Sequence, residues 1–150
     1  DEYVAMIAAL SANPAAAAAA IAPLFSDMAL DRSGAVGSVA VGPADDAALA
    51  ADPARRERLE AMLAEAFRTG ATGLAADIVS YTMIPWGFEV ADVQAPVTAF
   101  YGADDLVCGP AHGQWYVDQL PHGDLRVVPD VGHLVALTAW ADVLSALRGP

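Results

Sequence analysis

The sequence is poor in positive charge and in cysteine. Its 150 residues contain 7 basic residues, all of them arginine, against 19 acidic ones, which gives a formal net charge of -12. Nucleic acids and anionic membranes bind to basic surfaces, so we expect neither of them as a partner. The one cysteine, Cys108, cannot form an internal disulfide, and the expected location is therefore the cytoplasm.

The sequence also lacks a basic leader and a long, strongly apolar run near its start. An alanine run lies between Pro14 and Pro23, but it is too weakly apolar to span a bilayer. The chain begins at Asp1 rather than at methionine, which predicts that further residues precede it in the complete protein. We expect no targeting segment and no membrane span within the 150 residues.

Hydrophobic residues make up 56% of the chain, which predicts a protein that folds around a core. The first half has the composition of helices, which we expect near residues 2–10 and 14–30. The glycine-punctuated segment 33–38 predicts a flexible link. Asp52 and Pro53 then predict a helix start, because aspartate is a good N-cap and proline suits the first helical position.

Apolar residues at helical spacing predict the core-facing sides of two further helices. The first set is Leu59, Met62, Leu63, Ala66 and Phe67. The second set is Leu74, Ile78 and Tyr81. The second helix must end near Ile84, because a residue that precedes proline is disfavoured in helical conformation.

The second half of the chain predicts strands that alternate with helices. Residues 96–101 and 125–128 favour strands, and residues 110–120 between them have helical composition. A strand, a helix and a second strand form a right-handed unit in which the two strands are parallel. An amphipathic helix over residues 134–147 is expected to follow.

Reactive groups follow both predicted strands. Asp104 and Asp105 come after the first strand, and His133 comes after the second. Loops at the carboxyl ends of neighbouring parallel strands lie close together. An imidazole is an effective general base when a buried carboxylate holds its other nitrogen, so we expect Asp105 to orient His133, with Asp104 as its competitor for this role. Gly102 and Gly132 precede these side chains and leave room for them.

The two loops resemble the acid loop and the histidine loop of the α/β-hydrolase family, with Asp105 in the position of the catalytic acid and His133 in that of the catalytic histidine. The resemblance extends in detail from about Trp86 to the end of the chain. It implies an α/β fold class: residues 91–150 would be the C-terminal part of an α/β-hydrolase core, with two parallel strands and flanking helices. Residues 1–90 would form a helical lid that precedes it.

The family's nucleophile is absent. It normally lies in a glycine-x-serine-x-glycine turn upstream of the acid. No serine of the chain has glycine two residues before it and two after it. The serines are Ser11, Ser26, Ser33, Ser38, Ser80 and Ser145. We therefore expect this chain to be the lid and C-terminal half of a longer hydrolase, and to be inactive alone.

The function that the resemblance implies is hydrolysis of an ester, thioester, lactone or similar small apolar substrate by a triad of nucleophile, histidine and aspartate. Met83, Trp86 and Phe88 are candidates for the walls of a substrate pocket, with core packing as the equal alternative. Cys108 lacks the surroundings of a nucleophile.

The other histidines, His112 and His122, are expected at the surface, and the spacing of the three histidines is not that of metal ligands. We expect no metal and no other cofactor. The alternative to an enzyme is a non-catalytic binding or interaction module on a truncated hydrolase scaffold. In either case an unpaired sheet edge predicts association, either as a homo-oligomer or with another chain.

Overall fold

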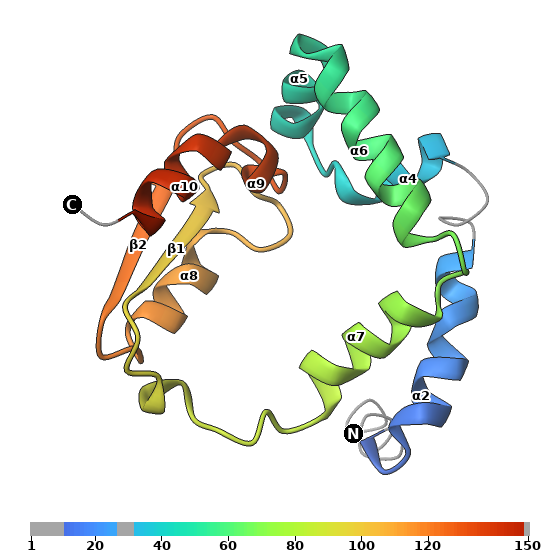
Figure 1. Cartoon of the computed structure of the whole chain (residues 1–150), viewed down its shortest axis with the longest axis horizontal. Coiled ribbons are helices and arrows are strands. Elements are labelled where there is room, and N and C mark those ends of the chain that lie inside the picture. The colour runs from blue at the N-terminus through green and yellow to red at the C-terminus, as the bar shows by residue number, and fades with distance from the viewer. Residues whose placement is uncertain (1–10, 27–31, 149–150) are drawn as a thin grey trace. The chain divides into compact units, whose positions relative to one another are not determined.

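The computed structural model describes residues 11–26 and 32–148 and divides the chain into two compact units (Figure 1). The first unit comprises Asp1–Val36 and Glu60–Phe88, and the second comprises Gly37–Leu59 and Glu89–Pro150. This division differs from the expected boundary at residue 90, because the segment from Gly37 to Leu59 joins the C-terminal residues. The lid role of residues 1–90 stays a prediction, and the expected helix over 2–10 lies outside the described residues.

The core of the first unit is a close contact between helices α2 (Pro14–Ile21) and α7 (Thr72–Met83). Its buried side chains are small, namely Ala17, Ala18, Ala75 and Val79. Small side chains let two helices approach closely, and this explains why an alanine-rich sequence packs here. A short 3-10 helix, η1 (Ala22–Phe25), follows α2 and also packs on α7. The end of α7 at Met83 agrees with the expected stop before Pro85.

Helix α6 (Pro53–Ala66) begins where the sequence predicts. The Asp52 carboxylate accepts a hydrogen bond from the backbone N–H of Arg55 at 3.1 Å, which caps the helix. The predicted apolar faces are only partly correct. Leu59, Leu63 and Phe67 are buried, but Met62 is 55% exposed, and Tyr81 of α7 is 59% exposed.

The expected flexible link at residues 33–38 is wrong, because these residues belong to helix α4 (Arg32–Val39). Ala35 and Val36 are 1% and 2% exposed, and their burial offsets the low helix propensity of the glycines around them. Helix α5 (Pro43–Ala51) follows, and the sequence analysis did not anticipate it. Its N-cap is Gly42, whose φ of 99° favours glycine, and its first position is proline.

The second unit contains the expected strand, helix and strand. They are β1 (Val97–Gly102), α8 (Pro110–Val117) and β2 (Gly123–Val128). The strands are parallel, and the register pairs Val97 with Gly123 and Gly102 with Val128. Both strands therefore end at the same level, and the loops that follow them start side by side.

Helices cover both faces of this sheet. Side chains alternate between the faces of a strand, so Phe100 and Tyr101 lie on opposite sides. Gly113 of α8 lies against Tyr101 and Leu125, and a groove on the other face is lined by Phe100 together with residues of the C-terminal helix. The predicted single C-terminal helix is interrupted at the buried Ala139, which separates α9 (Val135–Thr138) from α10 (Trp140–Leu147).

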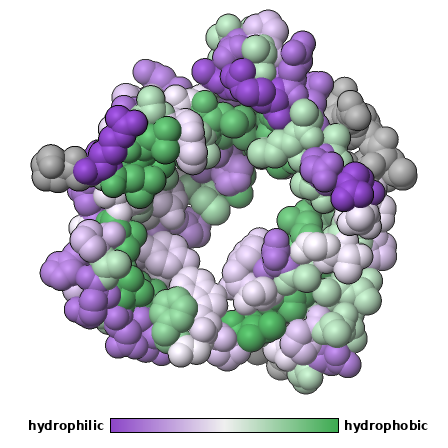
Figure 2. Space-filling model, in the orientation of Figure 1, coloured by the Kyte–Doolittle hydropathy of each residue, from purple (hydrophilic) through white to green (hydrophobic). Residues whose placement is uncertain are grey.

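A short 3-10 helix, η2 (Val90–Asp92), precedes β1. Apolar side chains are exposed over α10 and the sheet, namely Val127, Trp140, Leu144 and Leu147. Figure 2 shows green apolar surface beside purple hydrophilic surface over this part of the chain. Within residues 11–26 and 32–148, β1 and β2 pair only with each other. None of the described helices combines the length and the apolar character needed to cross a membrane.

The contact between α8 and the sheet leads to a test of packing. A Cβ at Gly113 would lie 2.6 Å from Leu125 Cδ1 and 2.6 Å from Tyr101 Cδ2. We therefore expect Gly113→Ala to lower the free energy of unfolding by about 1 to 3 kcal/mol through overpacking. The control is Gly37→Ala in α4, where nothing lies within 4 Å, and it should raise stability by up to about 1 kcal/mol. Urea unfolding measures both, and equal effects would contradict the close packing of α8.

Candidate active site

The candidate site lies at the carboxyl ends of β1 and β2. Two backbone hydrogen bonds join the loops there, from the N–H of Ala103 to the carbonyl of Val128 and from the N–H of Asp104 to the carbonyl of Val131, both at 2.9 Å. The acid loop after β1 (residues 103–108) and the histidine loop after β2 (residues 129–134) are therefore fixed against each other. This brings together side chains that are 28 positions apart in the sequence.

Gly102 permits this close approach. A Cβ at this position would lie 2.3 Å from the carbonyl oxygens of both Val131 and Gly132, a separation that no side chain can tolerate. The expectation that Gly102 leaves room at the strand end is therefore correct. In the histidine loop the residue with left-handed backbone conformation is Asp130, with a φ of 57°, and not Gly132.

The predicted contact between Asp105 and His133 is present. Oδ2 of Asp105 lies 3.0 Å from Nδ1 of His133. The side chain of Asp105 is 5% exposed, whereas that of His133 is 36% exposed, so the imidazole remains accessible to solvent. Oδ1 of Asp105 accepts hydrogen bonds from the backbone N–H groups of Val107 at 2.8 Å and Cys108 at 2.9 Å. Asp104, the competitor for this role, is exposed.

These contacts favour the ionised form of Asp105. Burial raises the pKa of Asp105, but the hydrogen bonds from the Cys108 N–H, the His133 ring and the Val107 N–H outweigh it, and the net pKa lies below its ordinary value. The carboxyl is therefore ionised at neutral pH and can only accept hydrogen bonds. Nδ1 of a neutral His133 must then carry the proton, and Nε2 has a free lone pair that can accept another.

Asp45 is a further residue of this site, and the sequence analysis did not identify it. It lies in the first turn of α5 and is 1% exposed. Its carboxylate accepts hydrogen bonds from the backbone N–H groups of His133 at 3.0 Å and of Leu134 at 2.9 Å. An acidic residue at this position of a helix is an ordinary sequence feature, and no local signal identifies partners 88 and 89 positions away.

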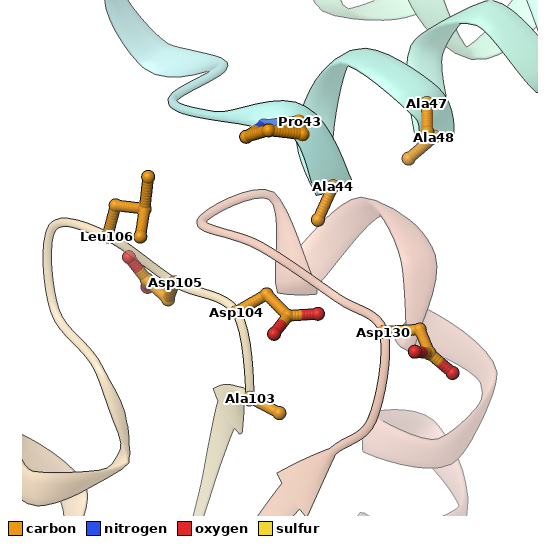
Figure 3. Close-up of a pocket in the computed structure, with 9 residues that line it drawn as sticks. All are labelled: Pro43, Ala44, Ala47, Ala48, Ala103, Asp104, Asp105, Leu106 and Asp130. Atoms are coloured by element: carbon orange, nitrogen blue, oxygen red, sulfur yellow. The ribbon is translucent and has the colours of Figure 1, made fainter.

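A cavity of about 660 Å³ lies beside the acid loop within the second unit (Figure 3). Alanines of α5 form one wall, and the ends of the two strands form the other. The residues that line it are Pro43, Ala44, Ala47, Ala48, Ala103, Asp104, Asp105, Leu106 and Asp130. The cavity therefore joins an apolar helix face to a set of carboxylates.

The three candidate substrate-binding residues do not line this cavity. Met83 packs partly buried against the α2–α7 core of the first unit. Trp86 and Phe88 are 44% and 53% exposed, with ring centroids 5.8 Å apart. All three belong to the first unit, and their binding role stays a prediction.

The remaining polar candidates lie apart from the site or at its margin. His112 and His122 are exposed, as expected, and Cys108 is half-buried in the acid loop. In the part of the chain that the structure describes, no group of three or more histidine, cysteine, aspartate or glutamate side chains is placed to hold a metal ion.

Comparison with known proteins identifies a similar fold. No protein-family profile and no curated protein sequence matches the chain. A solved structure of an N-acyl homoserine lactone degrading enzyme is similar to it, with a TM-score of 0.53 and 24% sequence identity. The similarity covers 77% of this chain and 45% of that one, so the chain spans less than half the length of the enzyme. It establishes a mixed α/β fold for this chain.

The lowered pKa of Asp105 predicts how stability depends on pH. A carboxyl whose pKa is lower in the folded state stabilises the fold above its ordinary pKa, near 3.8, and this contribution is lost as the pH falls through the lower folded value. Asp105→Asn should therefore reduce stability at pH 7 by about 1 to 3 kcal/mol and weaken the acid dependence. Asp104→Asn, on the exposed neighbour, is the control. Unfolding curves from pH 2 to 7 that coincide for the Asp105 variant and the unaltered chain would contradict this account.

Proposed function

We propose that this chain supplies the acid and the base of a hydrolase of the α/β type. The observation that carries the proposal is the hydrogen bond between Asp105 and Nδ1 of His133, formed at the ends of two adjacent parallel strands. A buried, ionised carboxylate that holds one nitrogen of a solvent-accessible imidazole is the arrangement that general-base catalysis requires. Asp104, exposed beside the pair, is not the acid in this proposal.

The proposed reaction is acyl transfer. Nε2 of His133 takes the proton from a nucleophilic hydroxyl as the hydroxyl attacks the substrate carbonyl, and Asp105 stabilises the imidazolium that forms. The same proton then passes to the leaving oxygen or sulfur as its bond to the acyl carbon breaks. His133 next takes a proton from a water that attacks the acyl-enzyme, and returns it to the nucleophile oxygen as that oxygen leaves. The sequence contains no serine in a nucleophile turn, so the proposal requires a nucleophile from residues outside these 150.

The proposed substrate is a small ester, thioester or lactone with an apolar part. Two observations support this class. The enzyme of similar fold degrades N-acyl homoserine lactones, which combine a lactone ring with an acyl chain. The cavity beside Asp105 has an alanine wall on α5 that could accept apolar groups of the substrate. Met83, Trp86 and Phe88 remain proposed contacts for the same substrate.

The second candidate function is a non-catalytic interaction module. The exposed apolar side chains of α10 and the two-stranded sheet favour it, because such surfaces associate in water. Both candidates predict association of the 150-residue chain, so hydrolytic activity separates them. An oligomer in light scattering, together with no hydrolytic activity of the natural reading frame that contains the chain, supports the module.

The proposed enzyme is tested by hydrolysis of an N-acyl homoserine lactone and of a p-nitrophenyl ester. We expect no activity above buffer for the 150-residue chain, and activity for the natural reading frame that includes a nucleophile upstream of Asp1. In that protein His133→Ala should abolish acylation, because no base then accepts the proton. Asp105→Asn should lower kcat by about 10⁴-fold, because an amide favours the wrong tautomer of the imidazole.

The control for His133 is His122→Ala, which removes an exposed imidazole from the turn before β2 and should leave kcat unchanged. Labelling by a serine-directed fluorophosphonate gives a second measure. Labelling of the His133→Ala protein at the unaltered rate would remove His133 from the mechanism and overturn the proposal.

A further inference from the structure

We propose that Asp45 is a positioning residue that holds His133 in place for the pair with Asp105. This inference rests on the proposed function, and it concerns a residue of α5 to which neither the sequence pattern nor the comparisons give a role. Asp45 contacts the backbone of the histidine loop and not the imidazole itself, so it acts through His133.

Both oxygens of the Asp45 carboxylate accept hydrogen bonds from backbone N–H groups. Oδ2 accepts from the N–H of Val41 at 2.9 Å and from the N–H of His133 at 3.0 Å. Oδ1 accepts from the N–H of Leu134 at 2.9 Å. A carboxylate that is 1% exposed is costly to bury unless it is paired in this way. The three bonds therefore fix both the start of α5 and the backbone on which the imidazole stands.

The histidine loop is shaped to receive this carboxylate. A Cβ at Gly132 would lie 2.5 Å from Oδ1 and 2.7 Å from Cγ of Asp45, so any larger residue at position 132 would displace it. The same closeness leaves no room for the longer side chain of glutamate at position 45. Asparagine fits the space, but its amide group would place an N–H donor against a backbone N–H donor. The site therefore requires aspartate at position 45 and glycine at position 132.

Asp45 also connects the histidine loop to the cavity, because its helix lines that cavity. Ala44, Ala47 and Ala48 line the cavity, while Asp45 on the same helix bonds to the histidine loop. Displacing the loop by about 1 Å is enough to reduce a positioned reaction by about 100-fold. Loss of Asp45 should therefore disturb the alignment of the imidazole with Asp105. Ala47 and Ala48 lie beyond the first turn of α5 and should keep their part of the apolar wall.

The test measures the tautomer of His133 by ¹⁵N NMR of the imidazole, at a pH where the ring is neutral, in the folded 150-residue chain. In the unaltered chain we expect the proton on Nδ1. In Asp45→Asn we expect the signals to shift toward a mixture of tautomers, with faster amide hydrogen exchange at His133 and Leu134. A merely structural residue would lower the melting temperature and leave the tautomer of the folded state unchanged.

Asp46→Asn is the matched control, because it removes the same charge from the next, exposed position of the same helical turn. It should leave the imidazole signals unchanged. Should Asp45→Asn fail to fold, Gly132→Ala displaces the same carboxylate from the other side and should shift the tautomer in the same direction. If either variant, Asp45→Asn or Gly132→Ala, folds and His133 still carries its proton on Nδ1 as in the unaltered chain, the positioning role of Asp45 is overturned.

Activity assays separate this inference from the proposed function. In the protein that includes the nucleophile, Asp45→Asn should lower kcat by about 100-fold with little change in KM. If His133→Ala is fully active, the proposed function fails whatever Asp45 does. If His133→Ala is inactive while Asp45→Asn keeps both the tautomer and kcat of the unaltered protein, only the role of Asp45 fails.

Discussion

The hydrogen bond between Oδ2 of Asp105 and Nδ1 of His133 is the interaction on which this account depends. It exists because β1 and β2 are parallel and end in register, which starts both loops at the same level. The backbone bonds between the loops and the absence of a side chain at Gly102 then close the remaining gap. One carboxylate thereby orients a ring whose side chain is 36% exposed.

Two carboxylates hold the histidine in different ways. Asp105 acts on the imidazole and is itself held by the N–H groups of Val107 and Cys108. Asp45 acts on the backbone of His133 and Leu134. Asp105 determines which ring nitrogen carries the proton, and Asp45 holds the backbone that positions the ring. Because Asp45 belongs to α5, the segment from Gly37 to Leu59 contacts the histidine loop through hydrogen bonds.

The sequence predicted those parts of the fold that local chemistry determines. Proline and glycine bound the β-favouring residues of β1, and Asp52 with Pro53 starts α6, so both were found. Segment 33–38 was misjudged because burial of Ala35 and Val36 outweighs glycine propensity, an effect of packing that no local pattern contains. The contact of an acid-loop carboxylate with His133 is predicted from the two parallel strands, and the choice of Asp105 over Asp104 rests on the resemblance to the acid loop of the α/β-hydrolases. Asp45 could not be predicted, because its partners are backbone groups far away in the sequence and backbone groups carry no sequence signal.

The most direct test of the central claim is the position of the ring proton of His133 in the unaltered chain, observed by two-dimensional ¹H–¹⁵N correlation of the neutral imidazole. The account predicts a protonated Nδ1, with its proton at low field through the bond to an ionised Asp105, and an unprotonated Nε2. A proton on Nε2, with Nδ1 unprotonated, would contradict it, because Nε2 would then have no free lone pair with which to take a proton from a nucleophile.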